Sequence, residues 1–303
     1  MRHLLFATGL AALLWSTGGL RGAAPRGPLL LDAAHAGESA MVAVGERGLI
    51  LRSTADHPEW RPAVVPDAWT LCGVTFADDR NGWAAGHDGF ILRTRDGGAT
   101  WEVAEQARDR ETSFLDVLAL DARRVIAIGG FGVYWETDDA GGTWEARRLL
   151  DEDVHLNRLT RAPNGTLFIA GEAGTLLRSR DEGRNWSSLD TGNEASFYGV
   201  LPLRDGAVLA YGLRGRVYRS EDDGDTWEQV TTGSEGLLLT GAEMPDRTIV
   251  LAGQARICLA SRDGGRTFGR VQHDVPAIAE LLVSHEGELL SFGEAGISRI
   301  QVP

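Results

Sequence analysis

Short apolar runs separated by polar turns dominate the chain, and one stretch near its first third shows the pattern clearly. Four runs of strand length, 71–76, 83–85, 90–94 and 100–104, alternate with turns rich in glycine and aspartate. Aspartate bonds its own downstream backbone and glycine accepts positive φ, so Asp96-Gly97-Gly98 predicts a tight turn. The continuous run Phe90-Ile91-Leu92 suits a strand buried between sheets. The stretch therefore predicts a four-stranded unit, with Trp101 opening its last strand.

The same unit recurs along the chain. Its leading glycine stands at positions 45, 86, 129, 171, 212, 253 and 293, so successive copies are 40 to 43 residues apart. Each copy carries three or four short strand signals. A period near 41 residues with four strands per copy is typical of β-propellers. The sequence therefore predicts an all-β chain folded as a seven-bladed β-propeller.

The two ends of the chain differ from the repeats. Residues 1–24 combine a basic start, an apolar run from Leu4 to Trp15 and the small residues Gly22-Ala23-Ala24. This is the pattern of a secretory signal peptide, with an uncleaved N-terminal anchor as the alternative. Residues 25–303 then form a single propeller domain. We expect a periplasmic or secreted protein without a membrane span after cleavage.

The seventh copy ends before a fourth strand. Propellers often close by borrowing a strand from the other terminus, but residues 25–28 are few and rich in proline. Two arrangements remain open from the residues alone. Either the last blade has three strands, or residues 29–31 pair differently from the inner strand expected for the first blade.

Several residue types recur in one register, and a recurring residue is more readily explained by packing than by a site. The tryptophan that follows each turn, beginning with Trp60, is expected to pack between adjacent blades. Arginines after the third strand, at 52, 93, 178 and 219, are expected to pair with an acid or to stack on a tryptophan. The structural repeat residues are Asp96, Trp101, Asp139, Trp144, Asp181, Trp186, Asp223, Trp227, Asp263 and Phe268.

The connections between blades vary from copy to copy. In a propeller they gather on one face around the channel, and a segment free of the repeat's packing role is where a site is most expected. Arginine, tryptophan and tyrosine are common anchors of protein interfaces. A solvated loop with ordinary charges is the alternative for each residue. The candidate partner-binding residues are Arg108, Arg110, Arg147, Arg148, His155, Trp69 and Tyr198.

Composition narrows the classes of function. The formal net charge of −13 argues against non-specific binding to nucleic acid or to anionic lipid. Cys72 and Cys258 fall in copies three steps apart, so we expect buried, unbridged thiols. Histidines and cysteines show no metal-ligand spacing and no nucleophile motif is present, so we expect neither a metal, nor another cofactor, nor catalysis. We expect a monomer.

The turn motif carries a family resemblance. The segments 94–101, 179–186, 220–227 and 261–268 resemble the Asp-box, or bacterial neuraminidase repeat. The longer segment from Asn81 to Thr94 resembles the photosystem II stability/assembly factor family. That resemblance covers essentially all of residues 25–303. It implies a non-enzymatic lumenal or periplasmic propeller that binds protein partners while a membrane complex assembles.

Sialidases share the Asp-box and give the alternative function, a glycoside hydrolase or a glycan-binding module. They resemble one another in a Phe/Tyr-Arg-Ile-Pro segment, an arginine triad and a tyrosine nucleophile. This chain lacks that segment, and Tyr198 is the one tyrosine placed near a channel. We therefore predict a scaffold that binds a protein, a membrane-associated complex or a transporter.

Overall fold

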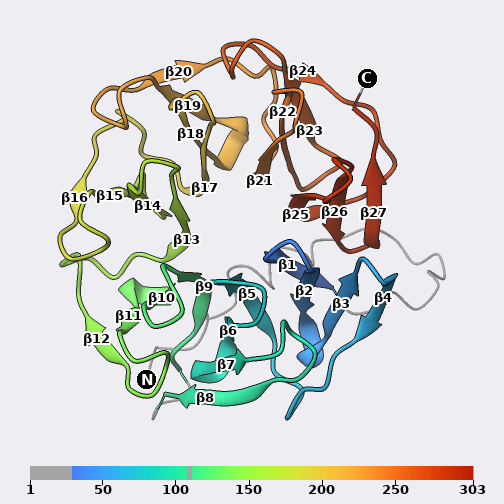
Figure 1. Cartoon of the computed structure of the whole chain (residues 1–303). Helices are drawn as coiled ribbons and strands as arrows, with labels where there is room; N and C mark the ends of the chain where they lie inside the picture. The colour runs from blue at the N-terminus through green and yellow to red at the C-terminus, as the bar shows by residue number, and fades with distance from the viewer. Residues whose placement is uncertain (1–28, 108–110, 303) are drawn as a thin grey trace, which may run out of the picture.

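Seven antiparallel β-sheets surround a central channel in the computed structural model, which describes residues 29–107 and 111–302 (Figure 1). Within each sheet the strands follow one another in sequence order from the channel outward. The innermost strands of consecutive blades contact one another, and the last of them contacts the first. The predicted all-β, seven-bladed propeller is confirmed. The predicted signal peptide, residues 1–24, lies outside the described residues.

The first three blades hold twelve strands. They are β1 (Leu30–Ala36), β2 (Ala40–Gly45), β3 (Ile50–Thr54) and β4 (His57–Pro62); β5 (Leu71–Phe76), β6 (Gly82–Gly86), β7 (Phe90–Thr94) and β8 (Glu102–Gln106); β9 (Phe114–Ala119), β10 (Val125–Gly129), β11 (Tyr134–Thr137) and β12 (Glu145–Arg147).

The remaining blades have four, four, four and three strands. They are β13 (Leu156–Arg161), β14 (Leu167–Gly171), β15 (Leu176–Ser179) and β16 (Ser187–Ser188); β17 (Phe197–Pro202), β18 (Val208–Gly212), β19 (Val217–Ser220) and β20 (Glu228–Val230); β21 (Leu238–Glu243), β22 (Ile249–Gly253), β23 (Cys258–Ser261) and β24 (Gly269–Arg270); β25 (Ile278–Val283), β26 (Leu289–Gly293) and β27 (Gly296–Ile300).

The leading glycine of each repeat is explained by a close backbone approach. Gly86 ends β6 beside the start of the inner strand, where an added Cβ would lie 1.9 Å from the carbonyl oxygen of Thr70. Gly45 and Gly129 are in the same position, with a Cβ 2.0 Å from a carbonyl oxygen. Their φ values are near −170°, which any residue adopts. Glycine is therefore required because any side chain would clash with the neighbouring backbone, and not because of its backbone conformation.

The turn between the third and fourth strands is held by its aspartate. Asp96 accepts hydrogen bonds from Thr94 Oγ1 at 2.8 Å, from the backbone N–H of Thr100 at 2.9 Å and from Thr100 Oγ1 at 2.6 Å. Trp101 precedes β8 and packs in the core between the first and second blades, with Val42 and Leu92. The predicted inter-blade role of Trp101 is confirmed. The prediction that it begins the strand is wrong, because the pairing of β8 with β7 begins at Glu102.

One predicted turn residue is wrong. In the fifth blade Asp222 accepts the bonds from Ser220 Oγ at 2.8 Å and from Thr226 Oγ1 at 2.6 Å. Asp223 instead has φ 56° and bonds Arg180 of the fourth blade at 3.1 Å. Two adjacent aspartates stand at this turn, so the sequence alone does not distinguish them. The hydrogen bonds from Ser220 and Thr226 identify Asp222 as the turn residue.

Three of the arginines that share a register bond the turn of the next blade, and the fourth stacks within its own blade. Arg52 Nε donates to the carbonyl oxygen of Gly97 at 2.7 Å, in the following blade's turn. Arg219 Nε makes the same bond to Gly264 at 2.7 Å, and Arg93 lies over the ring of Trp83 at 5.5 Å. The prediction that they pair with an acid or stack on a tryptophan is confirmed for Arg93, Arg178 and Arg219, whereas Arg52 bonds a backbone carbonyl oxygen.

Two sets of connections emerge on opposite faces of the disc. Gly48 N–H donates to Trp69 O at 2.6 Å and Gly132 N–H donates to Val154 O at 2.7 Å, so the turns after the second strands lie beside the inter-blade loops. We call this side the loop face. On the other side, Gly97 N–H donates to Arg80 O at 3.0 Å, beside the Asp-box turns. The predicted gathering of the variable loops on one face is confirmed.

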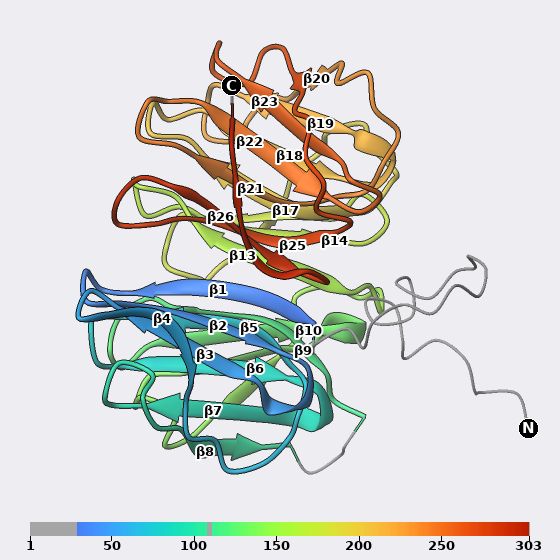
Figure 2. The same cartoon turned by 90° about the vertical axis from the view of Figure 1, so that its right-hand side faces the viewer.

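The first and last blades meet at a seam without a shared sheet. β1 pairs with β2, and the last blade has three strands among the described residues. In the side view, β25 and β26 lie next to β1 (Figure 2). Leu30, Met41, Leu290 and Phe292 fill the seam. Of the two arrangements open from the sequence, the three-stranded blade is the one observed.

Candidate functional site

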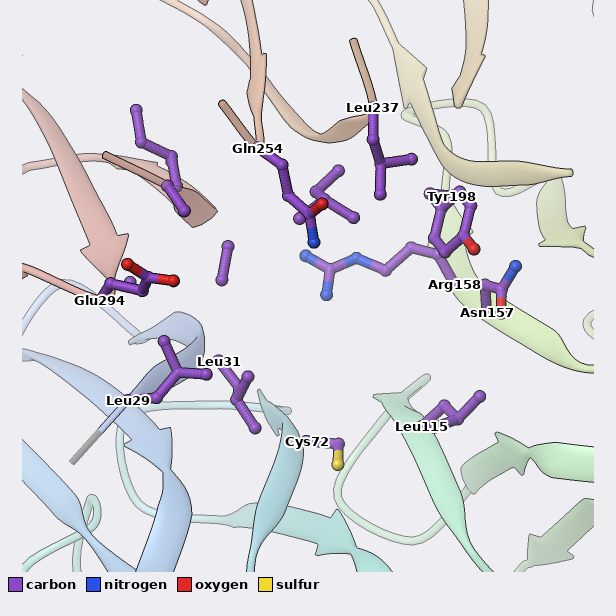
Figure 3. Close-up of a pocket in the computed structure, with 15 residues that line it drawn as sticks. Leu29, Leu31, Cys72, Leu115, Asn157, Arg158, Tyr198, Leu237, Gln254 and Glu294 are labelled. Atoms are coloured by element: carbon purple, nitrogen blue, oxygen red, sulfur yellow. The ribbon is translucent and has the colours of Figure 1, made fainter. Parts of the chain in front are cut away.

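A cavity of about 70 Å³ occupies the mouth of the channel on the loop face (Figure 3). Every blade contributes at least one lining residue, so the cavity is a product of the closed ring. Its floor is Arg158, which reaches from the fourth blade toward the channel centre.

An irregularity repeated in all seven blades creates the wall of this cavity. In each blade the pairing of the innermost strand with its neighbour skips one residue, close to the start of the strand. A skipped, or bulged, residue is outside the alternation that assigns side chains to the two sheet faces. All seven skipped residues line the cavity, and we call them the bulge ring. They are Leu31, Cys72, Leu115, Asn157, Tyr198, Leu239 and Ala279.

The bulge ring is apolar on most of its circumference and polar on one side. Leu31, Leu115 and Leu239 face the cavity, and Leu29 and Leu237 extend the apolar surface. Asn157 and Tyr198, on consecutive blades, form the polar side, and Asn157 Nδ2 donates to Phe197 O at 2.8 Å. An apolar wall with few polar groups is typical of pockets that hold an apolar side chain or ligand.

Cys72 and Tyr198 are not activated as nucleophiles. Burial raises the pKa of the Cys72 thiol to about 12, and the carboxylates of Asp32 and Asp116 add to the increase. Burial and then the Glu172 carboxylate raise the pKa of the Tyr198 phenol. Both groups are therefore protonated at neutral pH. Among the described residues both cysteines are unbridged, as predicted.

Below the bulge ring, Arg158 joins four blades. Its guanidinium lies 3.0 Å from Asp32 on the first blade and 3.8 Å from Asp116 on the third, and it also pairs with Glu280 on the seventh. The acids are held by further bonds. Asp32 accepts from the Val74 N–H at 2.8 Å and Asp116 from the Leu159 N–H at 2.7 Å. The charge of Arg158 is thus fully used within the protein, which excludes it as an anion receptor.

Burial also changes the acids of this cluster. It raises the pKa of Glu280 to about 8 and that of Asp116 to about 6, and the attraction of Arg158 offsets only part of the effect. The same acids hold the pKa of Arg158 above its usual value, although burial opposes them. The cluster therefore carries at most a small net charge, and its groups are directed at one another.

The arrangement gives no support to hydrolysis. A sialidase-like site needs several arginines that converge with a tyrosine and an acid, whereas Arg158 is the one arginine lining the cavity in the described part of the chain. Asp32, Asp116 and Glu280 are engaged by Arg158 and by backbone N–H groups. Glu294 is the one acid in the lining of the cavity among the described residues, so no pair of acids faces a substrate there. In residues 29–107 and 111–302, no group of three His, Cys, Asp or Glu side chains is placed to hold a metal ion.

Three of the sequence-predicted site residues lie on the loop face in or near the cavity. Tyr198 is part of the bulge ring. His155 lies on the loop face beyond it, with Nδ1 3.7 Å from Glu172 and its ring 4.8 Å from that of Phe131. Arg148 pairs with Asp153 at 2.9 Å within the same inter-blade loop.

The remaining predicted residues that the structure describes do not line the cavity, although Trp69 also stands in an inter-blade loop of the loop face. Trp69 is stacked on Phe90, with ring centroids 3.7 Å apart, and packs on the core between the first two blades rather than into the cavity. Arg147 lies in β12, where its Nη1 is 3.1 Å from Glu136 and 3.0 Å from the carbonyl oxygen of Gly183 in the next blade. It therefore acts as the inter-blade tie where Glu136 occupies the usual arginine position. Arg108 and Arg110 lie outside the described residues.

Sequence reasoning missed most of the site. The bulge ring has leucine in three blades and four other residue types in the rest, so repetition does not reveal it. One signal was available, because Arg158 is a charged residue in the middle of the inner strand Leu156–Arg161, where the strand faces the channel. The position one residue after each buried strand start would have located the ring.

Sequence comparison relates the chain to one family. The model of the photosynthesis system II assembly factor YCF48 matches residues 52–146 and 108–242. The photosystem II assembly protein Ycf48 of Thermosynechococcus vestitus (strain NIES-2133 / IAM M-273 / BP-1) is 24% identical over 135 residues, which are 44% of this chain and 39% of that protein. The photosystem II assembly lipoprotein Ycf48 of Synechococcus sp. (strain CC9605) is 33% identical over 94 residues, 30% of this chain and 28% of that protein. The matched regions thus span less than half of either relative.

Solved structures agree on the fold. A structure described as YCF48 bound to D1 peptide has a TM-score of 0.75 at 22% identity, and covers 92% of this chain and 95% of that one. YCF48 from Cyanidioschyzon merolae has a TM-score of 0.73 at 18% identity, covering 92% and 97%. The WD40 propeller domain of Doa1 also matches, with a TM-score of 0.71 at 13% identity, covering 91% and 94%, so these likenesses show the fold alone. Because the family model extends over more than half of the sequence, the chain belongs to the photosystem II assembly factor Ycf48 family.

Proposed function

We propose that this protein is a non-catalytic, extracytoplasmic scaffold that binds a polypeptide segment of a membrane-protein partner at the loop-face mouth of its channel. The observation that carries the proposal is the bulge ring, seven residues that form an apolar cup with one polar side and no activated group. Such a cup can hold an apolar side chain, and it offers no group that would transform it.

The relatives support a role in assembly. Two proteins similar to this chain are named photosystem II assembly proteins, and a propeller of the same fold is described as bound to D1 peptide. A peptide is also what the geometry favours. One buried apolar side chain contributes about 1.5–3 kcal/mol, so a stable complex needs an extended segment that contacts the rim as well as the cup.

Two observations support the extracytoplasmic location. The Synechococcus relative is named a lipoprotein, and residues 1–24 have the composition of a secretory signal peptide. Among the described residues no helix is long and apolar enough to cross a membrane.

The experiment is affinity capture of the full chain, tagged at its C-terminus, from detergent-solubilised membranes of the source organism, followed by mass spectrometry. Leu115→Glu and Leu239→Glu place a charge in the apolar wall of the cup. Val103→Glu is the matched control, because Val103 is 43% exposed on β8 at the rim of the disc.

We expect one dominant membrane protein in the wild-type and Val103→Glu captures, and its loss from both cup variants. Circular dichroism and urea midpoints establish that the cup variants are folded. A partner that persists in folded Leu115→Glu and Leu239→Glu contradicts the site. The absence of any partner from the wild-type capture contradicts the scaffold function.

A further inference from the structure

Phe131 is an aromatic side chain in an unusual place. It is the central residue of the turn Gly130–Gly132 on the loop face, with φ 55° and ψ 38°, and 52% of it is exposed. Positive φ disfavours residues with a bulky side chain. The equivalent positions in other blades carry Arg47, Asp88, Ala173 and Arg214, which are small or polar. Neither backbone conformation nor core packing therefore accounts for a phenylalanine here.

The exposed ring contacts a residue that leads directly into the wall of the cavity. The ring of His155 meets that of Phe131 edge to face, with centroids 4.8 Å apart and planes at 80°. The backbone N–H of His155 donates to the Glu172 carboxylate at 3.1 Å, and His155 stands two residues before Asn157 of the bulge ring. Phe131, His155 and Asn157 thus form one strip from the loop-face turn of the third blade to the cup, with Glu172 beside it.

The charges along this strip are mainly negative. The turn of Phe131 is bonded to the loop that follows Asp151, Glu152 and Asp153, through the Gly132 N–H and the Val154 carbonyl oxygen at 2.7 Å. These three acids are exposed, and Arg148 neutralises only Asp153. Glu172 adds a fourth carboxylate. An exposed aromatic ring beside unneutralised carboxylates attracts a cation, because the ring face and the acids act together.

We propose that Phe131 is the anchor at which the loop face recognises an arginine or lysine of a basic, apolar polypeptide segment, whose apolar side chain enters the cup. This inference rests on the proposed function and specifies the chemistry of the partner. The separation between Phe131 and the cup sets the spacing between the basic and the apolar side chain of the segment. The acids at 151–153 select a positive charge on that segment. An acidic or purely polar segment is disfavoured by the same carboxylates.

The test measures binding of three fluorescein-labelled synthetic peptides to the full chain by fluorescence anisotropy. One peptide carries arginines and leucines separated by glycine and serine, the second has glutamate in place of arginine, and the third has serine in place of leucine. The protein variants are Phe131→Asn, Phe131→Tyr and the rim control Val103→Asn. Asparagine is chosen because it tolerates positive φ, so loss of folding does not confound the result.

We expect the arginine–leucine peptide to bind at least about tenfold more tightly than either of the others, with an affinity that falls as salt rises. Phe131→Asn should weaken it about fivefold to tenfold, the size of one partly desolvated cation–π contact. Phe131→Tyr and Val103→Asn should retain the affinity. Equal binding of the glutamate peptide, or unchanged binding by Phe131→Asn, overturns the proposal.

The capture experiment separates this inference from the proposed function. If folded Leu115→Glu and Leu239→Glu lose the membrane partner while Phe131→Asn retains it, the cup is the docking site and the anchor is wrong. If all three variants retain the partner, both the cup and the anchor are wrong. Loss of the partner from Phe131→Asn together with the cup variants, and not from Val103→Asn, is the result expected here.

Discussion

Arg158 Nη1 lies 3.0 Å from Asp32 Oδ1 across the channel, and this pair joins the fourth blade to the first. The same guanidinium pairs with Glu280 on the seventh blade. Asp32 and Glu280 stand on the two sides of the seam, where no shared sheet links the first and last blades. Arg158 therefore links the first and last blades to the fourth at the centre of the ring.

Removal of the Arg158 guanidinium should lower the free energy of unfolding. Arg158→Met leaves Asp32, Asp116 and Glu280 buried without their cation, and breaking a buried ion pair costs about 3–5 kcal/mol. The measurement is urea denaturation at neutral pH. Arg180→Met is the control, since Arg180 is 51% exposed and pairs only with surface acids, and its loss should cost about 1 kcal/mol or less. Equal losses for the two variants would show that Arg158 is an ordinary surface-like charge.

Glu280 gives the stability a specific pH dependence. Burial raises its pKa in the folded protein from 4.5 to about 8, so the folded state keeps a proton that the unfolded chain has released. Stability should therefore fall as pH rises from about 6, the pKa of Asp116, to about 8, by up to about 1.4 kcal/mol per pH unit.

The variant Glu280→Gln should flatten this slope, because glutamine does not titrate. Denaturation midpoints across that range test it. Glu288→Gln, at the surface beside Arg299, should leave the slope as in the wild type. A slope that persists in Glu280→Gln would place its origin elsewhere.

Gly86 should tolerate no side chain. A Cβ there would lie 1.9 Å from Thr70 O and 2.8 Å from the Cα of Leu71, so Gly86→Ala must displace backbone at a cost of about 3 kcal/mol. Gly269 on β24 has no atom within 4 Å of the corresponding point, and Gly269→Ala should lie within about 0.5 kcal/mol of the wild type. Thermal or urea unfolding compares the two. A tolerated alanine at 86 would refute the close-approach explanation of the repeated glycine.

Asp222, rather than Asp223, should maintain the turn of the fifth blade. Its hydrogen bonds from Thr226 and Ser220 lower its pKa to about 2, so the stabilisation is complete above the unfolded value near 3.8 and is lost as pH falls through about 2. Asp222→Asn should lower the unfolding midpoint at neutral pH and converge with the wild type in strong acid. Asp223→Asn leaves the bonds to Ser220 and Thr226 intact and should shift the midpoint less. The reverse order would restore the aspartate chosen from the sequence.

The fold could be predicted because its determinants repeat. Glycine at the strand crossing, aspartate in the turn and tryptophan between blades meet the same neighbours in each copy, so the same residue is selected each time. The bulge ring has no such constraint, and Tyr198 is the one member that its residue type brought to attention. Arg147 shows the opposite error. It resembled a loop-face arginine, and only the pairing of β11 with β12 places it opposite Tyr134, beside Glu136, as an inter-blade tie.

The bulge ring also bears on how such a protein can change what it holds. Each member is skipped by the pairing of its strand, so neither sheet face depends on its size or polarity. The seven positions are Leu, Cys, Leu, Asn, Tyr, Leu and Ala on an otherwise uniform frame. Each of these positions can therefore be substituted independently of the others, while the repeated framework around it stays the same. A library restricted to these seven codons would therefore vary the specificity of the mouth without redesigning the propeller.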